Sequence, residues 1–468
     1  MKIRVASFGI LCSIAFLWAC SGVRKVPASN FQNDWKVQRL AATPQDWSGD
    51  PDRGFNYLIY GGYIGTGIPW EVMSKRFKNK DALLKREGAN AYAPAPFNVF
   101  TTQHGVDVLS GNCLTCHASK LRGEYIPGLG NAFSDFQDNN QFGASIMNMA
   151  VRSKYKKESP EYESFDEFGR FYKAIAPKII TPNPGVNPAF RLEEACIQYR
   201  EEEDLSYRKD PQFKTMKYTL ASDVPPLWNI KKKNALYYNA MGRGDYAKLL
   251  MQASVLGIED STAARQVLEE FKHVVAWAAS IEPPVYPEKI DRALAADGAL
   301  VFEEHCQKCH GSYGEEETYP NKLVSLEVVK TDPYYAQYFT QSSGLAGWYN
   351  QSWFGTAQPA SSLEPSDGYI APPLDGIWAT APYLHNGSVP TIEALLDSKK
   401  RPDFWKKAGN SHAYDLQQLG WKYEAFSKDK GKTVYDTTLP GYGNQGHYFG
   451  DILENSERKA LLEYLKTL

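Results

Sequence analysis

The sequence has few cysteines, few histidines and almost no net charge. Its 468 residues include seven cysteines and eight histidines, and 52 basic against 54 acidic residues give a formal net charge of −2. A charge this close to zero provides no basic field for binding nucleic acid. After the first twenty residues, no segment is apolar enough to cross a bilayer. The 43% hydrophobic and 23% charged residues are typical of a globular protein, which excludes a disordered or fibrous chain.

The first twenty residues have the features of an export signal. Two basic residues precede an apolar stretch over residues 8–19, which is too short to span a membrane. The segment ends in Leu17-Trp18-Ala19-Cys20, which resembles the bacterial lipoprotein box. We predict a lipoprotein signal peptide over residues 1–20, lipidation of Cys20, and a periplasmic or cell-envelope protein held to the membrane by this anchor alone. A simple secretory signal is the alternative.

Two five-residue segments, 113–117 and 306–310, share the pattern Cys-x-x-Cys-His. Residues i, i+3 and i+4 of a helical turn share one face, so both thiols can bond to a haem while the histidine faces its iron. A redox dithiol or a zinc site is disfavoured because neither needs the appended histidine twice. The pattern predicts two covalently bound haem c groups. The predicted attachment residues are Cys113, Cys116, Cys306 and Cys309, and the predicted iron ligands are His117 (haem 1) and His310 (haem 2).

The remaining cysteines leave no material for a disulfide framework. Cys12 lies in the signal and Cys20 is the lipidation candidate, so only Cys196 is unassigned. It has no histidine nearby in the sequence, and we interpret it as a structural thiol.

Related phrases follow the two motifs, Pro225-Pro-Leu-Trp-Asn-Ile230 and Pro372-Pro-Leu-Asp-Gly-Ile377. Apolar spacing predicts helices over 262–280, 291–305 and 456–468, and the proline-rich segment 282–287 is typical of a linker. We therefore expect a mainly α protein with two duplicated cytochrome c-type domains. The predicted boundaries are a loop-rich N-terminal extension over 21–100, a haem 1 domain over 101–284 and a haem 2 domain over 285–468.

The sixth iron ligand decides whether a haem only passes electrons or binds a small molecule. No histidine occurs between His117 and His273, so an open or water-bound haem 1 is expected. For haem 2, His385 and His447 are the candidates. His412 is a further candidate in a less distinctive sequence context, whereas His104 and His305 are expected to be surface or structural residues. The methionines that could close haem 1 instead are Met147, Met149, Met216, Met241 and Met251.

A longer stretch, residues 370–391, closely resembles the signature of bacterial di-haem cytochrome c peroxidases and their relatives. The phrases at 60–69, 225–228, 242–245 and 439–450 are most similar to the rubber oxygenase A-like branch of that superfamily. The resemblance runs from about residue 55 to the C-terminus.

The resemblance implies a role for each haem. Haem 1 is the reactive group, and haem 2 is six-coordinate with His447, or alternatively His385, as its distal ligand. Trp228 falls where the family places a tryptophan that carries electrons between the haems. A calcium ion is implied at main-chain oxygens of Thr380 and Pro382.

The sequence departs from the peroxidases because it lacks their distal histidine after the first motif, and no distal glutamate is identifiable. This favours oxygen chemistry over peroxide cleavage. We expect a di-haem oxidoreductase in which haem 1 activates peroxide or dioxygen and haem 2 relays electrons. It would use a small redox partner or electron donor and act on a hydrophobic alkene. The alternatives are a pure electron carrier with both haems six-coordinate, and a haem-bearing binding or sensor protein. The charge runs at 231–233 and 315–317 are expected to be solvated faces.

Overall fold

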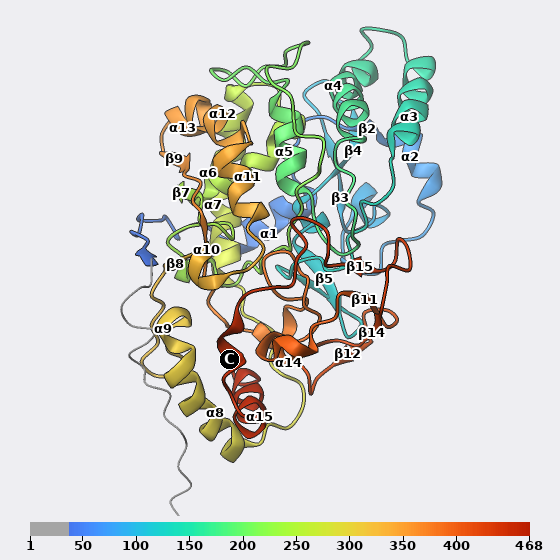
Figure 1. Cartoon of the computed structure of the whole chain (residues 1–468). Helices are drawn as coiled ribbons and strands as arrows, with labels where there is room; N and C mark the ends of the chain where they lie inside the picture. Colours follow the sequence, from blue (N-terminus) through green and yellow to red (C-terminus); the bar gives the residue numbers. More distant parts are fainter. Residues whose placement is uncertain (1–36) are drawn as a thin grey trace, which may run out of the picture. The chain divides into compact units, whose positions relative to one another are not determined.

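The computed structural model describes residues 37–468 (Figure 1). The predicted signal peptide and Cys20 lie outside the described residues. Of these residues, 38% are helical and 14% are in strands, with several small sheets. The prediction of a mainly α protein built from duplicated cytochrome domains is therefore wrong, and the fold is mixed α and β. Within residues 37–468, no helix is long and apolar enough to span a bilayer.

The helical elements are distributed along the whole described chain. The α-helices are α1 (Pro51–Tyr60), α2 (Trp70–Met73), α3 (Gln141–Lys154), α4 (Pro160–Ile175), α5 (Ala189–Ile197), α6 (Tyr246–Leu250), α7 (Ser261–Ser280), α8 (Arg292–His305), α9 (Gln307–His310), α10 (Leu326–Val329), α11 (Tyr334–Gln341), α12 (Leu345–Gln351), α13 (Trp353–Thr356), α14 (Ile392–Leu396) and α15 (Asn455–Leu465). The short 3-10 helices are η2 (Ser74–Arg76), η3 (Gly88–Ala91), η4 (Cys113–Thr115), η5 (Ile230–Lys232), η6 (Met251–Leu256), η7 (Ile377–Ala379), η8 (Ser398–Lys400) and η9 (Tyr448–Gly450).

The strands are short and antiparallel. They are β1 (Val37–Arg39), β2 (Ile68–Pro69), β3 (Phe97–Thr101), β4 (Asp107–Gly111), β5 (Ala118–Leu121), β6 (Glu124–Pro127), β7 (Gly242–Gly244), β8 (Lys322–Ser325), β9 (Ser361–Leu363), β10 (Gly368–Ile370), β11 (Phe404–Lys407), β12 (Tyr414–Asp415), β13 (Gly420–Trp421), β14 (Tyr423–Phe426) and β15 (Tyr435–Asp436). The three-stranded sheets have the orders β2-β4-β3, β1-β8-β10 and β14-β11-β15, and β5 pairs with β6.

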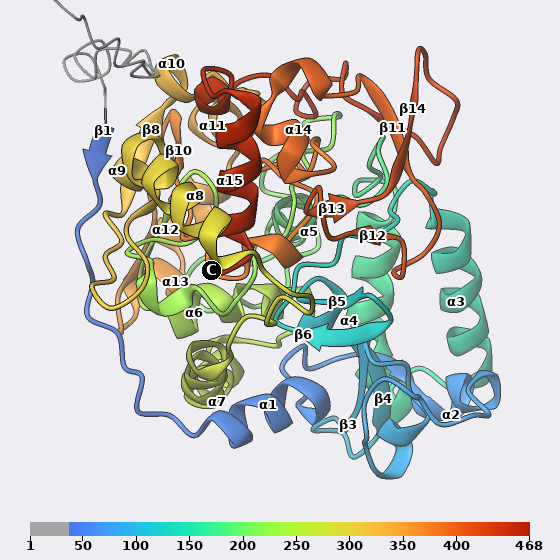
Figure 2. The ribbon, with the colours of Figure 1, turned by 90° about the horizontal axis from the view of Figure 1, so that it is seen from below.

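Helices α8 and α15 pack side by side, as Figures 1 and 2 both show. The Asp291 side chain caps α8 by accepting from the main-chain N–H groups of Ala293 and Leu294. A Cβ on Gly298 of α8 would collide with the Ala460 carbonyl of α15, so only glycine permits this close crossing. The crossing fixes the helix that leads into the second Cys-x-x-Cys-His segment.

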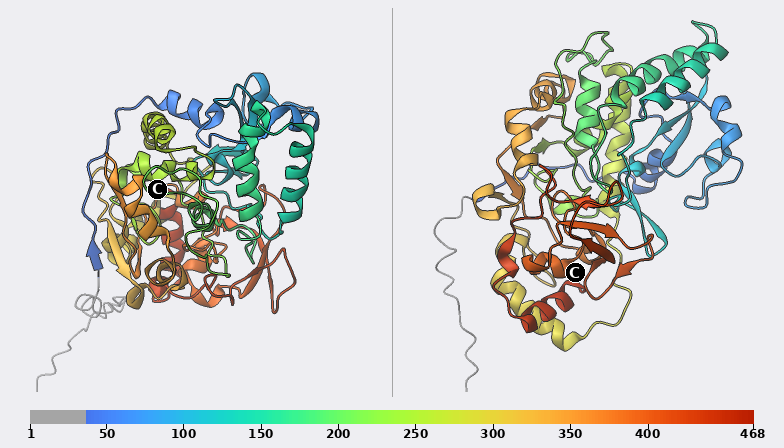
Figure 3. Two further views of the ribbon diagram at one scale, coloured as in Figure 1. Left: turned by 90° about the horizontal axis from the view of Figure 1, so that it is seen from above. Right: turned by 45° about the vertical axis from the view of Figure 1, so that its right-hand side comes forward.

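Two other helix pairs lie in the part of the chain before residue 285. Helix α1 packs on α7, and the main-chain N–H of Asp50 donates to His273 Nδ1 at 2.8 Å. Helices α3 and α4 pack together, and the Asn148 side chain donates to the Gly169 carbonyl at 2.8 Å (Figure 3).

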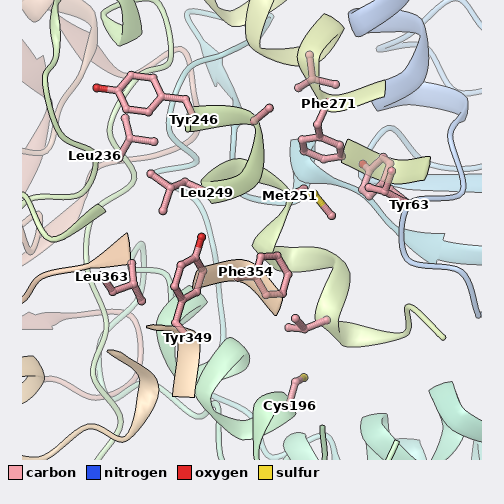
Figure 4. Close-up of a cluster of buried hydrophobic side chains, with 14 of the residues drawn as sticks. Tyr63, Cys196, Leu236, Tyr246, Leu249, Met251, Phe271, Tyr349, Phe354 and Leu363 are labelled. Carbon is pink, nitrogen blue, oxygen red and sulfur yellow. The ribbon is translucent and has the colours of Figure 1, made fainter. Parts of the chain in front are cut away.

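The largest hydrophobic cluster, here called core 1, draws on residues before and after residue 285, which are here called the first and second halves of the chain. Figure 4 shows part of it, with Tyr63 and Phe271 from the first half and Tyr349 and Phe354 from α12 and α13. A second cluster, core 2, surrounds α8 and α15 and also includes Trp228 from the first half. Because each core takes residues from both halves, the two motifs do not lie in two equivalent repeats.

Candidate functional site

The first motif lies between strands β4 and β5. Asn112 caps η4: its side-chain oxygen accepts from the Leu114 N–H at 2.9 Å, and its amide donates to the Ala95 carbonyl and to Asn98 Oδ1. The His117 N–H donates to the Cys113 carbonyl at 2.9 Å, which closes a single helical turn. This turn brings both thiols and the imidazole to one place, as haem attachment requires.

Side chains from distant segments hold this turn. The Cys113 N–H donates to Tyr63 Oη at 2.9 Å, and the Asn187 side chain donates to Cys116 Sγ at 2.8 Å. His117 Nδ1 is buried and has no hydrogen-bond partner. Burial, together with the neighbouring charge of Lys233, lowers the pKa of His117 to about 4. The imidazole is therefore neutral at physiological pH, the form that ligates iron.

Two charged residues lie near this motif: Glu193, which the sequence did not single out, and Lys233, which was expected only as part of a solvated run. Burial raises the pKa of Glu193, in α5, to about 8, and its Oε2 is buried without a partner. The Glu193 carboxylate is close enough to Cys116 to contribute to the raised pKa of that thiol. Burial lowers the pKa of Lys233 to about 8. No sequence pattern distinguishes these residues from the charged residues beside them.

The lysine triplet is only partly the solvated face that we expected. Lys231 is exposed, but Lys232 forms ion pairs with Glu317 and Asp375, and Lys233 is largely desolvated. The run 315–317 is exposed, as expected.

The second motif lies at the end of a long helix. Cys306 caps α8, and α9 carries Cys309 and His310. His310 Nδ1 is hydrogen-bonded to the Pro372 carbonyl at 2.8 Å. A carbonyl can only accept, so Nδ1 carries the proton and Nε2 is left free to bind a metal, which is the usual arrangement of a ligating histidine.

The structure brings His447 to the second motif. The ring centres of His310 and His447 lie 6.2 Å apart, and His447 Nδ1 is buried without a hydrogen-bond partner. Two imidazoles that bind one metal need about 2 Å for each metal–nitrogen bond plus about 1 Å to each ring centre, or roughly 6 Å in total. The donor set and its spacing therefore fit a haem iron between His310 and His447.

The sequence around His447 explains its position. A Cβ on Gly446 would collide with the main chain of Lys330 and Thr331, and Gly446 has a φ of 84°. The loop can pass this close only with glycine there. The His447 N–H donates to the Val329 carbonyl at 2.7 Å, so the loop is bound to the end of α10.

His385, the alternative ligand, lies elsewhere. Its ring stacks on Tyr369 with a centroid distance of 4.1 Å and also contacts Tyr335 and Tyr238. Burial lowers the pKa of His385 to about 3, and its Nε2 is buried without a partner. The structure therefore places His385 in an aromatic cage, whereas His447 faces His310.

The other histidines lie in separate surroundings, and most have contacts that do not involve either motif. His104 approaches Glu259 at 4.0 Å, His273 accepts from Asp50, and the His412 ring lies against Gly123. His305 ends α8, one residue before Cys306. Within residues 37–468, His117 thus has no second imidazole among its ring contacts.

The five methionines considered as ligands of haem 1 differ in exposure and in the cluster in which they pack. Met149 is 66% exposed and Met216 44%, so neither is placed to cover a buried haem. Met147 packs in a separate cluster around Val151 and Phe165. Met241 and Met251 are fully buried in core 1, the cluster that also contains Leu114 of the first motif.

Trp228 lies at the junction of the two cores. It is 7% exposed and belongs to core 2, whereas its chain neighbours Leu227 and Ile230 pack in core 1. Its indole N–H donates to the Asp375 carbonyl at 2.9 Å, and the Asn229 side chain donates to the Pro373 carbonyl at 3.2 Å. The two Pro-Pro-Leu phrases therefore meet at this tryptophan. Its hydrogen-bond partner Asp375 follows Pro372, whose carbonyl binds His310, by three residues.

The remaining predicted sites differ in their surroundings. Thr380 and Pro382 lie in a loop where the Ala381 carbonyl accepts from the Trp421 indole at 2.9 Å. The described residues contain no group of three His, Cys, Asp or Glu side chains suited to a metal ion. A calcium ion at this loop would thus depend on main-chain oxygens. Cys196 is fully buried in core 1, and burial raises its pKa to about 12.

Comparison with known proteins identifies one family model, described as RoxA-like, cytochrome c-like, which matches residues 368–406. This segment includes Pro372, Asp375 and His385. Two proteins of Sinorhizobium fredii, both described as uncharacterised, are similar over longer stretches. One, y4iJ, is 33% identical over 291 residues, covering 48% of this chain and 46% of its own length. The other, y4iM, is 23% identical over 303 residues, covering 56% of this chain and 67% of its own length.

The chain thus spans less than half of the first of these relatives. The family match supports a haem-containing oxidoreductase with a cytochrome c-like segment similar to the rubber oxygenase-like cytochromes.

Proposed function

We propose that the protein is a di-haem c-type oxidoreductase with two unequal haems. The haem held by Cys113, Cys116 and His117 would activate dioxygen or peroxide, and the haem held by Cys306, Cys309 and His310 would store and relay electrons. The observation that supports this most is the difference in histidine partners. The ring centres of His447 and His310 lie 6.2 Å apart, whereas within residues 37–468 His117 has no such ring contact with another histidine.

The protein's own residues would supply what each haem needs. A neutral His117 would bind iron and leave the opposite face open. Glu193 is protonated at neutral pH because burial raises its pKa to about 8, so it is our candidate for the proton donor near the first motif. Peroxide or dioxygen chemistry requires such a donor where no distal histidine is present.

Trp228 is the proposed electron relay between the two sites. Its indole N–H donates to a neutral carbonyl, that of Asp375, which cannot accept the proton outright. An oxidised indole held in this way would keep its proton and pass on the electron vacancy alone. Trp228→Phe should therefore slow electron transfer between the haems while both haems remain bound.

Spin-state spectroscopy of the resting haem-loaded protein tests the proposal. We expect one high-spin signal from haem 1 and one low-spin signal from haem 2, and a new absorption change when peroxide is added or when dioxygen meets the reduced protein. Two low-spin signals with no response to either oxidant would exclude it.

A hydrophobic alkene is the proposed organic substrate, which rests on the RoxA-like match of residues 368–406. Incubation of the loaded protein with polyisoprene in the presence of dioxygen should release shortened carbonyl-containing products. If the wild-type protein gives none, the alkene substrate is wrong while the haem assignment stands.

A pure electron carrier is the second candidate, favoured by the burial of Met241 and Met251 in core 1. A methionine on iron gives a weak long-wavelength absorption band, which Met241→Leu or Met251→Leu would abolish.

For both candidate functions we propose that the protein is exported. Cell fractionation of the wild type and of Cys20→Ala tests this.

A further inference from the structure

The side chain of Arg401 donates all five of its N–H groups to main-chain carbonyls. Nε donates to Ala394 (3.1 Å), Nη1 to Asn444 (2.7 Å) and Gly446 (2.6 Å), and Nη2 to Leu395 (2.8 Å) and His447 (3.2 Å). A guanidinium has five donors in a fixed planar fork, so this cradle satisfies it completely.

The five carbonyls belong to two separate segments. Ala394 and Leu395 lie in α14, whereas the other three lie in the loop over residues 444–447. Arg401 therefore fastens this loop to α14. The guanidinium carbon also lies 5.6 Å from the centre of the Tyr448 ring, on the other side of His447 in the chain.

His447 needs such support because its main chain is strained. It has a φ of 48° and a ψ of 50°, a left-handed conformation that costs a residue other than glycine about 1 kcal/mol. Arg401 donates to the carbonyl of Gly446, which precedes His447, and to the carbonyl of His447 itself. Since these carbonyls set the direction of the Cα–Cβ bond, Arg401 fixes where the imidazole points.

We propose that Arg401 is a positioning residue that holds the His447 imidazole toward His310. The inference rests on the proposed ligation of haem 2 by both histidines. A ligand must be held to within about 0.5 Å of its working position. Lysine, with three donors at a single point, cannot join the two segments, so the role requires the shape of arginine as well as its charge.

The test uses the haem-loaded full chain and the variants Arg401→Gln and Arg401→Lys. We expect both to convert part of haem 2 from low-spin to high-spin in electron paramagnetic resonance. Cyanide binding to haem 2 should also become roughly tenfold faster, the scale on which outer-sphere contacts affect metal sites. The unchanged spectrum of haem 1 reports that the variant is folded, and if Arg401→Gln does not accumulate, Arg401→Lys carries the test.

Arg458→Gln is the matched control. Arg458 also donates to main-chain carbonyls in this region, those of Leu396 and Gly450, but to neither carbonyl beside the His447 main chain. It should leave haem 2 low-spin.

His447→Ala separates the two proposals. If it leaves the low-spin signal unchanged, the ligation of haem 2 by His447 is wrong, and so is the role of Arg401. If His447→Ala removes the signal but Arg401→Gln and Arg401→Lys change neither the spectrum nor the cyanide rate, only the role of Arg401 is overturned.

Discussion

The two Cys-x-x-Cys-His segments have the same pattern but different surroundings. The first is a single turn between strands β4 and β5, held by Asn112 and Tyr63. The second ends α8, which packs on the C-terminal helix α15 and lies beside the loop that carries His447. The comparison teaches that the motif alone would set only where a haem can be attached. The elements packed around it would decide which faces of the iron are open.

Removal of either cysteine pair should have the largest effect. The double variants Cys113→Ala/Cys116→Ala and Cys306→Ala/Cys309→Ala should each lose one of the two proposed haems, because thioether bonds require the thiols. Mass spectrometry of the intact protein and a haem assay measure this. Cys196→Ala is the control and should keep both haems, since that thiol is buried in core 1. A double variant that retained two haems would contradict the assignment.

The helix crossing under the second motif should be the next most sensitive point. Gly298→Ala places a Cβ against the Ala460 carbonyl, and overpacking of this kind costs about 3 kcal/mol of unfolding free energy. Denaturant unfolding measures it. At Gly143 in α3 an added Cβ meets open space, so Gly143→Ala should be neutral or stabilising by up to about 1 kcal/mol. Equal effects at the two glycines would show that the α8–α15 crossing is looser than the structure has it.

Acid should destabilise the folded protein because His385, which the structure places away from His310, becomes protonated on unfolding. The pKa of His385 is lowered to about 3 in the folded protein, below its usual 6.5, so the unfolded chain binds more protons between these values. The contribution of neutral His385 to the free energy of unfolding is thus fully present above pH 6.5. It falls as the pH drops toward 3, and about 2 kcal/mol has been lost at pH 5.

The variant His385→Phe should show a shallower loss of stability between pH 6.5 and 5 while haem 2 stays low-spin. Unfolding curves at several pH values, with a spectrum of each sample, give both results. Loss of the low-spin signal in this variant would instead identify His385 as the ligand.

The smallest effect is expected at the cap of the first motif. Asn112→Ala removes three hydrogen bonds from a buried side chain and should lower the unfolding free energy by about 1–2 kcal/mol. It should leave the spectrum of haem 2 unchanged, because the side-chain hydrogen bonds of Asn112 go to the first motif and to Ala95 and Asn98, not to the second motif. Asn112→Asp keeps the capping oxygen and should recover part of the loss.

The sequence predicted the local helices well. The expected segments 262–280 and 291–305 correspond to α7 and α8, and 456–468 overlaps α15. Apolar spacing and the caps Asp260 and Asp291 are local signals, so they can be read without knowing the fold.

The fold class was wrong because its determinants are not local. The strands around the first motif are only four or five residues long, and they pair with neighbours that no periodic pattern distinguishes. The apparent duplication failed because α11 to α13, from the second half, pack into core 1. The predicted domain boundaries stay predictions.

For the candidate site, the sequence pointed to residues with unusual chemistry but not to those that support them. Because histidines are rare in this chain, the histidine count reduced the candidates mainly to His385 and His447, and the family resemblance favoured His447. Arg401 and Glu193 were missed because arginine and glutamate are common surface residues, and only the folded structure removes them from water.

The pairing of His310 with His447 also has a consequence for assembly. The two residues are far apart in the chain, and the loop that carries His447 lies between α14 and α15. Attachment of haem to Cys306 and Cys309 would need only the local segment, whereas closure of the second axial position would wait until the later segment that carries His447 has been made and α14 has formed. Haem 2 would therefore pass through an immature, five-coordinate stage during biogenesis, and its low-spin signature would mark completion of the C-terminal part of the fold.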